Sequence, residues 1–591
     1  MPKVYITACL LMMVIGTSAQ YYIRGEVKDE KGQPMQNVRI YMPATKSIFY
    51  SGMTGGFGIP SGNLYDSLIF TSDGFETAAL RIKSSEYQEI TLKMLSANAS
   101  TRKPKLVSIT LGSEGHIYPT AYYRDESYST LVENDFIKSS VNNTTGFAMR
   151  IDKASYSNVR RFINQGSKVP PDAVRIDEML NYFNFNYKEP QGKNVFNIES
   201  NITDCPWNKA NRLLFLNLSG KKLDLEKVPP SNFVFLIDVS GSMDLPNRLP
   251  LLKESFQLLV KSLRAKDTVS IVVYGGSVGV WMQPTGGAEK QKITKAIEEL
   301  EASGDTPGEA AIRTAYKVAE STFIKGGNNR IILATDGDFN VGQRTEKDLE
   351  ELVTKEKQSG VYLTCLGVGM GNYKDSKIEA LSKKGNGNFA YIDDIREAEK
   401  ILVTEFTQTL YSIANDAYFK LQFNPDLVKQ YRLIGYDNRK TVLSQLSDEL
   451  EGGEIGAGTS NTAIFEITPI TEDSLPHADQ NIAKLVMHYK IPHDTLDQEM
   501  RYDCVNNYTP FRLAPKNLQF ASAVCMFGLK LRESQYFPED IDWSDIKEVA
   551  SQSALKDDYL QNEFVMLLDK TATIYSDKKK KKKKGLFLGL L

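Results

Sequence analysis

Between residues 229 and 413 the chain alternates short apolar runs with longer amphipathic stretches. The apolar runs, such as 232–238 and 330–335, are continuous, which is typical of strands buried on both faces. The stretches between them, such as 249–263 and 308–323, repeat their apolar residues at helical spacing. Strands that alternate with helices form a parallel sheet that is covered on both sides. We therefore expect an α/β doubly wound domain here, with any ligand at the carboxyl ends of its strands.

Oxygen-bearing side chains follow two of these strands. The first apolar run ends in an Asp-x-Ser-x-Ser motif, which places one carboxylate and two hydroxyls around a common point. A threonine precedes the predicted helix 308–323, and a second aspartate follows the run 330–335. Such hard oxygen ligands suit Mg²⁺, Mn²⁺ or Ca²⁺. The predicted metal ligands are Asp238, Ser240, Ser242, Thr306 and Asp336.

The first residues have the organisation of a secretory signal peptide. Lys3 supplies a positive charge, residues 4–15 form a short apolar run, and residues 16–19 are small. The apolar run is too short to span a bilayer. We expect cleavage before Gln20, and hence a protein that is exported to the periplasm, the cell surface or the medium. An uncleaved N-terminal anchor is the alternative.

Outside the α/β domain the chain divides into further segments, so we expect a multidomain protein. Strand and turn signals alternate early in the chain, and a polar stretch follows them. Segments 190–225 and 413–500 lie on either side of the α/β domain, and we expect them to form one β-unit. The predicted segments are a signal peptide (1–19), a β-sandwich (20–94), a linker (95–125), an N-terminal flanking region (126–228), the α/β domain (229–413), a C-terminal flanking region that is β and then helical (414–577) and a lysine-rich tail (578–591).

Apolar residues at helical spacing also predict helices at 151–163 and 173–183 in the N-terminal flanking region. The α/β domain is expected to end in one helix over 395–413. After it the pattern becomes mostly β, and from Leu518 it is helical again.

Charge and cysteine content narrow the range of partners. The net charge of −2 gives no reason to expect nucleic acid as a partner, because proteins that bind it normally carry a basic face. Four of the five cysteines lie after the predicted signal peptide, and the sequence leaves open whether they are free thiols or disulfides. The lysine run at 578–584 is expected either to make weak contact with a membrane surface or to be a disordered extension.

Residues 229–413 resemble a von Willebrand factor type A domain, most specifically in the stretches 235–243 and 332–342. The resemblance implies a metal-ion-dependent adhesion site built from the five ligands named above, with Mg²⁺ (or Mn²⁺ or Ca²⁺) and a protein partner. From about residue 133 to about residue 568 the chain is similar to exported bacterial proteins that carry characteristic regions on both sides of the A domain.

Residues 20–94 resemble a carboxypeptidase regulatory-like β-sandwich, whose matching positions shape turns and core. These positions are Gly25, Val27, Asp29, Gly32, Pro34, Val38, Gly56, Phe57, Gly74 and Phe75.

Three functions compete on this reading. The favoured one is an adhesion or assembly protein that captures a partner carboxylate through its divalent cation. The second is a structural scaffold of the cell envelope, in which the metal only stabilises the domain. A hydrolase or phosphotransferase is disfavoured, because Ser240 stands where an aspartyl phosphotransferase needs a second Asp, and the chain has no phosphate-binding Gly-x-x-x-x-Gly-Lys loop. We therefore predict that the protein is not an enzyme.

Overall fold

The computed structural model describes residues 21–93 and 126–576, apart from short gaps. The chain forms two compact units, one before residue 117 and one after it. Within the described residues, no helix combines the length and apolar character needed to cross a membrane. The predicted signal peptide, linker and lysine tail lie outside the described residues. The gaps are 31, 37, 46, 53, 62, 73–74, 150, 276, 304–307, 338–345, 372, 438–451, 472–479, 493 and 495.

The N-terminal unit consists of two small sheets that share one apolar core. Alternate residues of most of its strands face this core, among them Ile23, Ile40 and Phe70. One sheet has the order β4-β1-β7, formed by Gly56–Ser61, Tyr21–Asp29 and Tyr87–Leu92. The other has the order β3-β2-β5-β6, formed by Ser47–Tyr50, Arg39–Met42, Tyr65–Thr71 and Ala78–Lys83.

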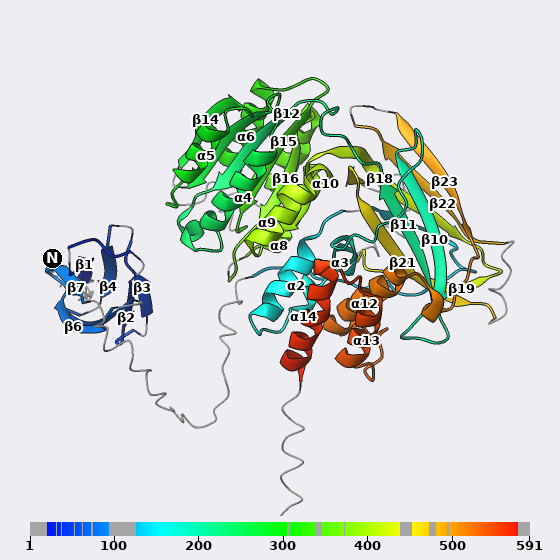
Figure 1. The fold of residues 1–591 in the computed structure, drawn as a ribbon, viewed down its shortest axis with the longest axis horizontal. Helices are drawn as coiled ribbons and strands as arrows, with labels where there is room; N and C mark the ends of the chain where they lie inside the picture. The colour runs from blue at the N-terminus through cyan, green and yellow to red at the C-terminus, as the bar shows by residue number, and fades with distance from the viewer. Residues whose placement is uncertain are drawn as a thin grey trace, which may run out of the picture. The chain divides into compact units, whose positions relative to one another are not determined.

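The α/β domain contains a six-stranded sheet of order β14-β13-β12-β15-β16-β17 (Figure 1). All neighbours pair in parallel except β13 and β14, which are antiparallel. The expected all-parallel sheet is therefore wrong at this edge, because only residue 276 separates the two strands and so short a connection can only form a hairpin. The strands are Ser231–Asp238 (β12), Thr268–Gly275 (β13), Ser277–Gly286 (β14), Asn328–Thr335 (β15), Tyr362–Gly367 (β16) and Phe389–Tyr391 (β17).

Helices cover both faces of this sheet, as the continuous apolar strands predict. Alternate residues of β12 belong to two different cores: Phe235 packs with residues of α4, whereas Leu236 packs with residues of α6. The helices are Leu249–Ser262 (α4), Lys290–Glu298 (α5), Gly308–Ser321 (α6), Glu346–Glu356 (α7), Asp375–Lys384 (α8), Ile395–Glu399 (α9) and Phe406–Leu410 (α10).

The single helix expected over 395–413 is wrong. A π-helical segment, Lys400–Thr404, separates α9 from α10. There the hydrogen-bond ladder slips by one residue, so that the Glu405 backbone N–H donates to the Lys400 carbonyl at 2.8 Å. The helix ends at Leu410, and strand β18 begins at Ser412.

A β-sandwich lies beside the α/β domain and draws strands from both flanking regions (Figure 1). Strand β11 precedes the α/β domain and pairs with β21, which follows it, with Leu214 opposite Phe465. Segments 190–225 and 413–500 thus share one β-unit, as expected. The first sheet is β10-β11-β21-β19-β8, formed by Phe196–Asp204, Arg212–Gly220, Ser460–Pro469, Val428–Ile434 and Ile137–Lys138. The second is β20-β18-β22-β23, formed by Gly453–Gly456, Ser412–Phe423, Asn481–Lys490 and Asp497–Val505, with β9 (Thr144–Ala148) also paired to β18.

The chain enters and leaves the α/β domain at the same place. Ser231 begins β12, and Tyr411 immediately precedes β18; their hydroxyl oxygens are 2.8 Å apart. Because the strands before and after the domain complete one sandwich, the α/β domain is an insertion between them.

Helices from both flanking regions form a third part of this unit around their own apolar core. The predicted helix 173–183 is shorter than expected: a 3₁₀ turn at Pro171–Ala173 precedes α3, because the Pro pair fixes an extended backbone before the helix can begin. The helices are Ala154–Asn164 (α2), Ile176–Asn181 (α3), Lys516–Leu531 (α12), Trp543–Ser553 (α13) and Tyr559–Tyr575 (α14).

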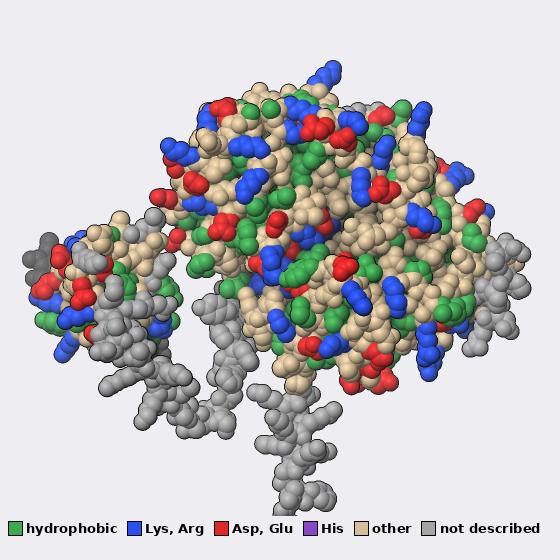
Figure 2. Space-filling model, viewed as in Figure 1, with side chains coloured by type: hydrophobic (Ala, Val, Ile, Leu, Met, Phe, Trp, Pro, Cys, Tyr) green, Lys and Arg blue, Asp and Glu red, His purple; other side chains and the backbone are tan. Residues whose placement is uncertain are grey.

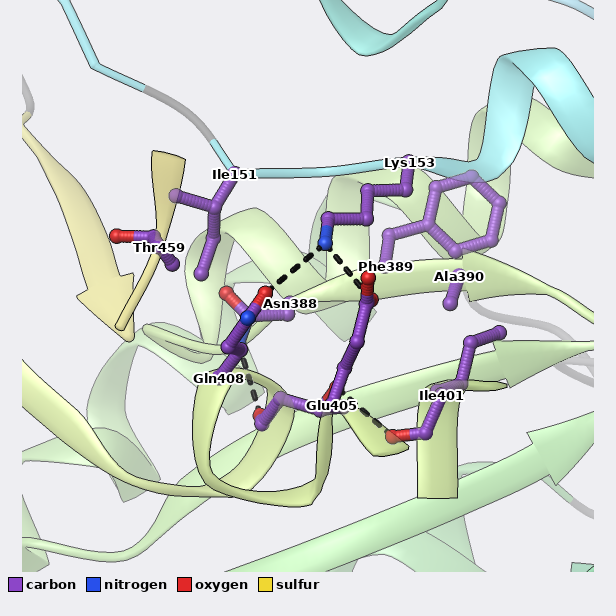
Figure 3. Close-up of a pocket in the computed structure, with 10 residues that line it drawn as sticks. Ile151, Lys153, Asn388, Phe389, Ala390, Ile401, Glu405, Gln408 and Thr459 are labelled. Atoms are coloured by element: carbon purple, nitrogen blue, oxygen red, sulfur yellow. Dashed lines mark hydrogen bonds and ion pairs between the residues drawn. The ribbon is translucent and has the colours of Figure 1, made fainter. Parts of the chain in front are cut away.

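Buried ion pairs join these helices to the α/β domain. Arg160 of α2 pairs with Asp393 just before α9, with Glu397 within α9 and with Glu563 of α14. Lys153, just before α2, donates to Glu405 at 2.7 Å and to Gln408 at 3.2 Å, and these contacts border a cavity of about 20 Å³ (Figure 3). The cavity has room for a single water molecule. The charged contacts fix the flanking helices against the domain.

Candidate metal centre

The predicted ligands lie at the carboxyl ends of two adjacent strands. Asp238 is the last residue of β12, and Asp336 directly follows β15. The two strands are parallel neighbours, with Ile237 opposite Ala334. The two carboxylates therefore reach the same edge of the sheet, as the sequence predicts.

The loop after β12 folds back over this edge. The Ser240 backbone N–H donates to Asp238 Oδ1 at 2.9 Å, and the Oγ atoms of Ser240 and Ser242 are 3.2 Å apart. Ser242 Oγ in turn donates to Asp336 Oδ2 at 2.9 Å. Asp238, Ser240, Ser242 and Asp336 thus form one continuous group of oxygens. Thr306, the fifth predicted ligand, lies outside the described residues.

Neighbouring residues hold the group in place. Thr335 Oγ1 donates to Asp238 Oδ2 at 2.8 Å and accepts the Gly337 backbone N–H at 2.9 Å. Gly275 lies where the chain is crowded, because a Cβ there would come within 2.6 Å of the carbonyl oxygens of Val239 and Ser303. The end of β13 therefore admits only glycine beside the ligand loop.

The described part of the site contributes two carboxylates and is deeply buried at its base. Asp238 and Asp336 are fully buried, and burial, with a further contribution from Asp336, raises the pKa of the Asp238 carboxyl to about 6. Among the described residues, no group of three or more His, Cys, Asp or Glu side chains is placed so that it could hold a metal ion. Two carboxylates and two hydroxyls fit a hard divalent cation, whose remaining positions would be taken by water or by further oxygens.

A basic side chain that the sequence does not single out also reaches the site. Arg248, at the N-terminus of α4, is only 4% exposed. Its Nη1 atom donates to Asp336 Oδ2 at 2.7 Å and to the Ser242 carbonyl, and its Nη2 atom donates to the Met370 carbonyl at 2.8 Å. In the sequence Arg248 is one polar residue before an amphipathic helix, and its spacing gives no sign that it points inward.

The cysteines lie away from this site. Cys205, Cys365, Cys504 and Cys525 are all free and buried. Burial raises the pKa values of their thiols, so they are unreactive apolar side chains. Of the two alternatives that the sequence leaves open, the structure has free thiols.

Comparisons with known proteins agree with this architecture. The family described as "von Willebrand factor type A domain" matches residues 232–409. The family described as "von Willebrand factor" matches residues 122–215, and "Uncharacterized protein YfbK, C-terminal" matches residues 408–574. The three matches follow the same order as the N-terminal flanking region, the α/β domain and the C-terminal flanking region.

Individual relatives differ in how much of the chain they share. The Escherichia coli protein described as "Uncharacterized protein YfbK" is 38% identical over 466 residues, which are 75% of this chain and 80% of that protein. Inter-alpha-trypsin inhibitor heavy chain H2 of Mesocricetus auratus is 30% identical over 281 residues, but only 30% of that protein is covered. A solved structure, von Willebrand factor type A from Catenulispora acidiphila, is 14% identical and covers 65% of this chain and 91% of its own, with a TM-score of 0.39. The likeness to YfbK extends through the A domain and the flanking regions, so the chain belongs to the YfbK family of von Willebrand factor type A domain proteins.

Proposed function

We propose that this protein binds a protein partner outside the cytoplasm, through a divalent cation held by Asp238, Ser240, Ser242, Asp336 and Thr306. The observation that carries the proposal is the convergence of four of these side chains at one sheet edge, with successive contacts of 2.9–3.2 Å. The cation would be Mg²⁺, or Mn²⁺ or Ca²⁺.

Only two carboxylates stand among the five proposed ligands, and this supports capture of an anionic group. Two carboxylates only balance the charge of a divalent cation, and the serine hydroxyls add none. A cation bound in this way keeps a strong attraction for a further oxygen ligand, and a partner's Asp or Glu carboxylate is the obvious protein group to supply it.

Recognition is proposed to be local. Lys or Arg and Asp or Glu side chains are interspersed over the face of the protein drawn in Figure 2. Mixed charge of this kind exerts little long-range steering on a partner. The partner would therefore be selected by contacts around the cation.

Binding is favoured over catalysis by what surrounds the site. Ser240 and Ser242 contact each other and Asp336, and none of these contacts joins a serine to a histidine base. The one described histidine, His488, stacks on Tyr418 in the β-sandwich.

The experiment is a pull-down from envelope extracts with the full chain as bait, in Mg²⁺ and again in EDTA. We expect a partner that is retained in Mg²⁺ and released by EDTA, and that Asp238→Ala does not retain. Asp267→Ala is the matched control, because Asp267 is equally buried but pairs with Arg264 elsewhere in the domain. A partner that Asp238→Ala retains in EDTA would replace this proposal with an envelope scaffold in which the metal is only structural.

A further inference from the structure

The surroundings of Arg248 match its side chain in both hydrogen-bond acceptors and space. Its guanidinium has three separate acceptors: the Asp336 carboxylate, the Ser242 carbonyl and the Met370 carbonyl. Gly369 leaves room for the side chain, since a Cβ at this position would lie 2.7 Å from Arg248 Nε. Gly369 also has a φ of +84°, which a residue with a side chain rarely adopts. An arginine that was merely near the site would not need this combination.

The acceptors of Arg248 belong to the predicted metal site. Asp336 is a predicted ligand, and the Ser242 carbonyl belongs to the residue whose Oγ is another. The guanidinium lies 2.7 Å from the Oδ2 atom that also accepts the Ser242 hydroxyl. A divalent cation that used Asp336 would therefore share this carboxylate with a permanent positive charge.

Two positive charges on one buried carboxylate repel each other, and the repulsion is strong where water is excluded. The carbonyls of Ser242 and Met370 hold the Arg248 guanidinium close to Asp336.

We propose that Arg248 is a built-in counter-cation of the metal site: it holds Asp336 in place without the metal and lowers the affinity for the metal. This inference rests on the proposed function. It adds that the site responds to cation concentration instead of holding its cation permanently. It also makes the loaded site more positive by one charge, which favours an anionic partner group.

The test is calorimetric titration of the full chain with Mn²⁺ alone, for wild type, Arg248→Gln and Arg248→Lys. Arg248→Gln should bind Mn²⁺ at least about tenfold more tightly than wild type, because the repulsion is gone. Arg248→Lys keeps the charge and should stay close to wild type. An unchanged or weaker affinity in Arg248→Gln would overturn the proposal, as would a Lys variant that binds as tightly as the Gln variant.

Arg264→Gln is the matched control, since Arg264 follows the other end of α4 and pairs with Asp267. It should lower the melting temperature but leave the Mn²⁺ affinity unchanged. An equal gain in Mn²⁺ affinity in Arg264→Gln would show a general charge effect and would overturn the proposal.

A second measurement separates this inference from the proposed function. In EDTA, Arg248→Gln, Asp336→Asn and the double variant form a cycle, in which the double variant should lose less stability than the sum of the single losses. Additive losses would show that the pair does not hold Asp336. If neither wild type nor Arg248→Gln binds Mn²⁺, the proposed function fails together with the affinity claim, while the cycle still decides whether the pair exists.

Discussion

Glu126 Oε1 accepts a hydrogen bond of 2.8 Å from the backbone N–H of Gly371, although the two residues belong to the flanking region and the α/β domain respectively. The Glu126 carboxylate also accepts hydrogen bonds from both terminal nitrogens of Arg161, at 3.0 and 2.9 Å. Gly371 follows Met370, whose carbonyl binds Arg248. The flanking region therefore holds the loop that borders the candidate metal centre.

Replacing Glu126 should cost stability. In Glu126→Ala, Arg161 would be left buried without its carboxylate, and such a loss destabilises a protein by about 3–5 kcal/mol. Urea denaturation measures the effect. The exposed Glu226→Ala is the comparison and should change the free energy of unfolding by less than about 0.5 kcal/mol. Equal effects for the two variants would mean that Glu126 has no clamping role.

Divalent cation should raise the melting temperature of the full chain, because a ligand that binds only the native state stabilises it. Thermal melts in EDTA and in millimolar Mg²⁺, Mn²⁺ or Ca²⁺ measure the difference, which Asp238→Ala should abolish. Thr306→Ala should reduce it less, since water can replace a neutral ligand. No shift with any of the three ions would count against the metal centre.

Without cation, Asp238 and Asp336 should respond to mutation in opposite directions. Asp336→Ala leaves Arg248 buried without its carboxylate and should destabilise the protein by about 3 kcal/mol. Asp238→Asn removes a buried charge but keeps an oxygen for the Ser240 N–H, so it should raise stability by about 1 kcal/mol. Thermal melts of both variants and wild type in EDTA at pH 7.5 measure these changes in stability. A loss of stability in Asp238→Asn would show that the buried charge of Asp238 is not unfavourable.

Arg160→Ala should be among the most damaging single substitutions in the flanking helices. It would leave Asp393 and Glu397 as buried carboxylates without their cation, at a cost of about 3–5 kcal/mol. Chemical denaturation of the purified variant measures the loss. Arg501→Ala, at a largely exposed side chain, should lose little.

Limited proteolysis should separate the two units. Cleavage within 95–125 should release the N-terminal β-unit as a folded fragment, because it has its own core. The A domain and its flanking regions should stay together, since one apolar core joins the domain to the β-sandwich and buried ion pairs join it to the flanking helices. Mass spectrometry of the fragments identifies the cuts, and early release of 413–500 alone would contradict the shared sandwich.

The α/β domain could be predicted closely because its strands are buried on both faces. The run 330–335 anticipates β15 to within two residues, and the run 232–238 anticipates β12 to within one residue. Strand β23 could not be found in this way, because its residues are mostly polar and exposed and it is defined by pairing with β22. In the N-terminal unit β3 and β6 have a similar character, since at most one residue of each is buried.

The ligands that could be predicted are the carboxylates that lie at the ends of apolar strands. Asp238 and Asp336 follow apolar runs directly, so their meeting follows from the parallel sheet. Arg248 and Glu126 act over long sequence distances, through contacts with Asp336 and Gly371. No local pattern marks such contacts, because they exist only after the domain and its flanking region have packed together.

The insertion of the α/β domain between β11 and β21 also imposes an order on folding. Strand β11 is almost entirely buried, yet its partner β21 is synthesised only after the whole domain. The inserted domain can complete its own sheet first. The sandwich cannot form until β21 is available, and until then the apolar strand β11 lacks that partner. Contacts so distant in sequence form slowly and leave intermediates prone to aggregation. Ser231 and Tyr411 lie at the two ends of the domain and are in contact. Folding of the domain therefore brings the two halves of the sandwich together and favours their pairing.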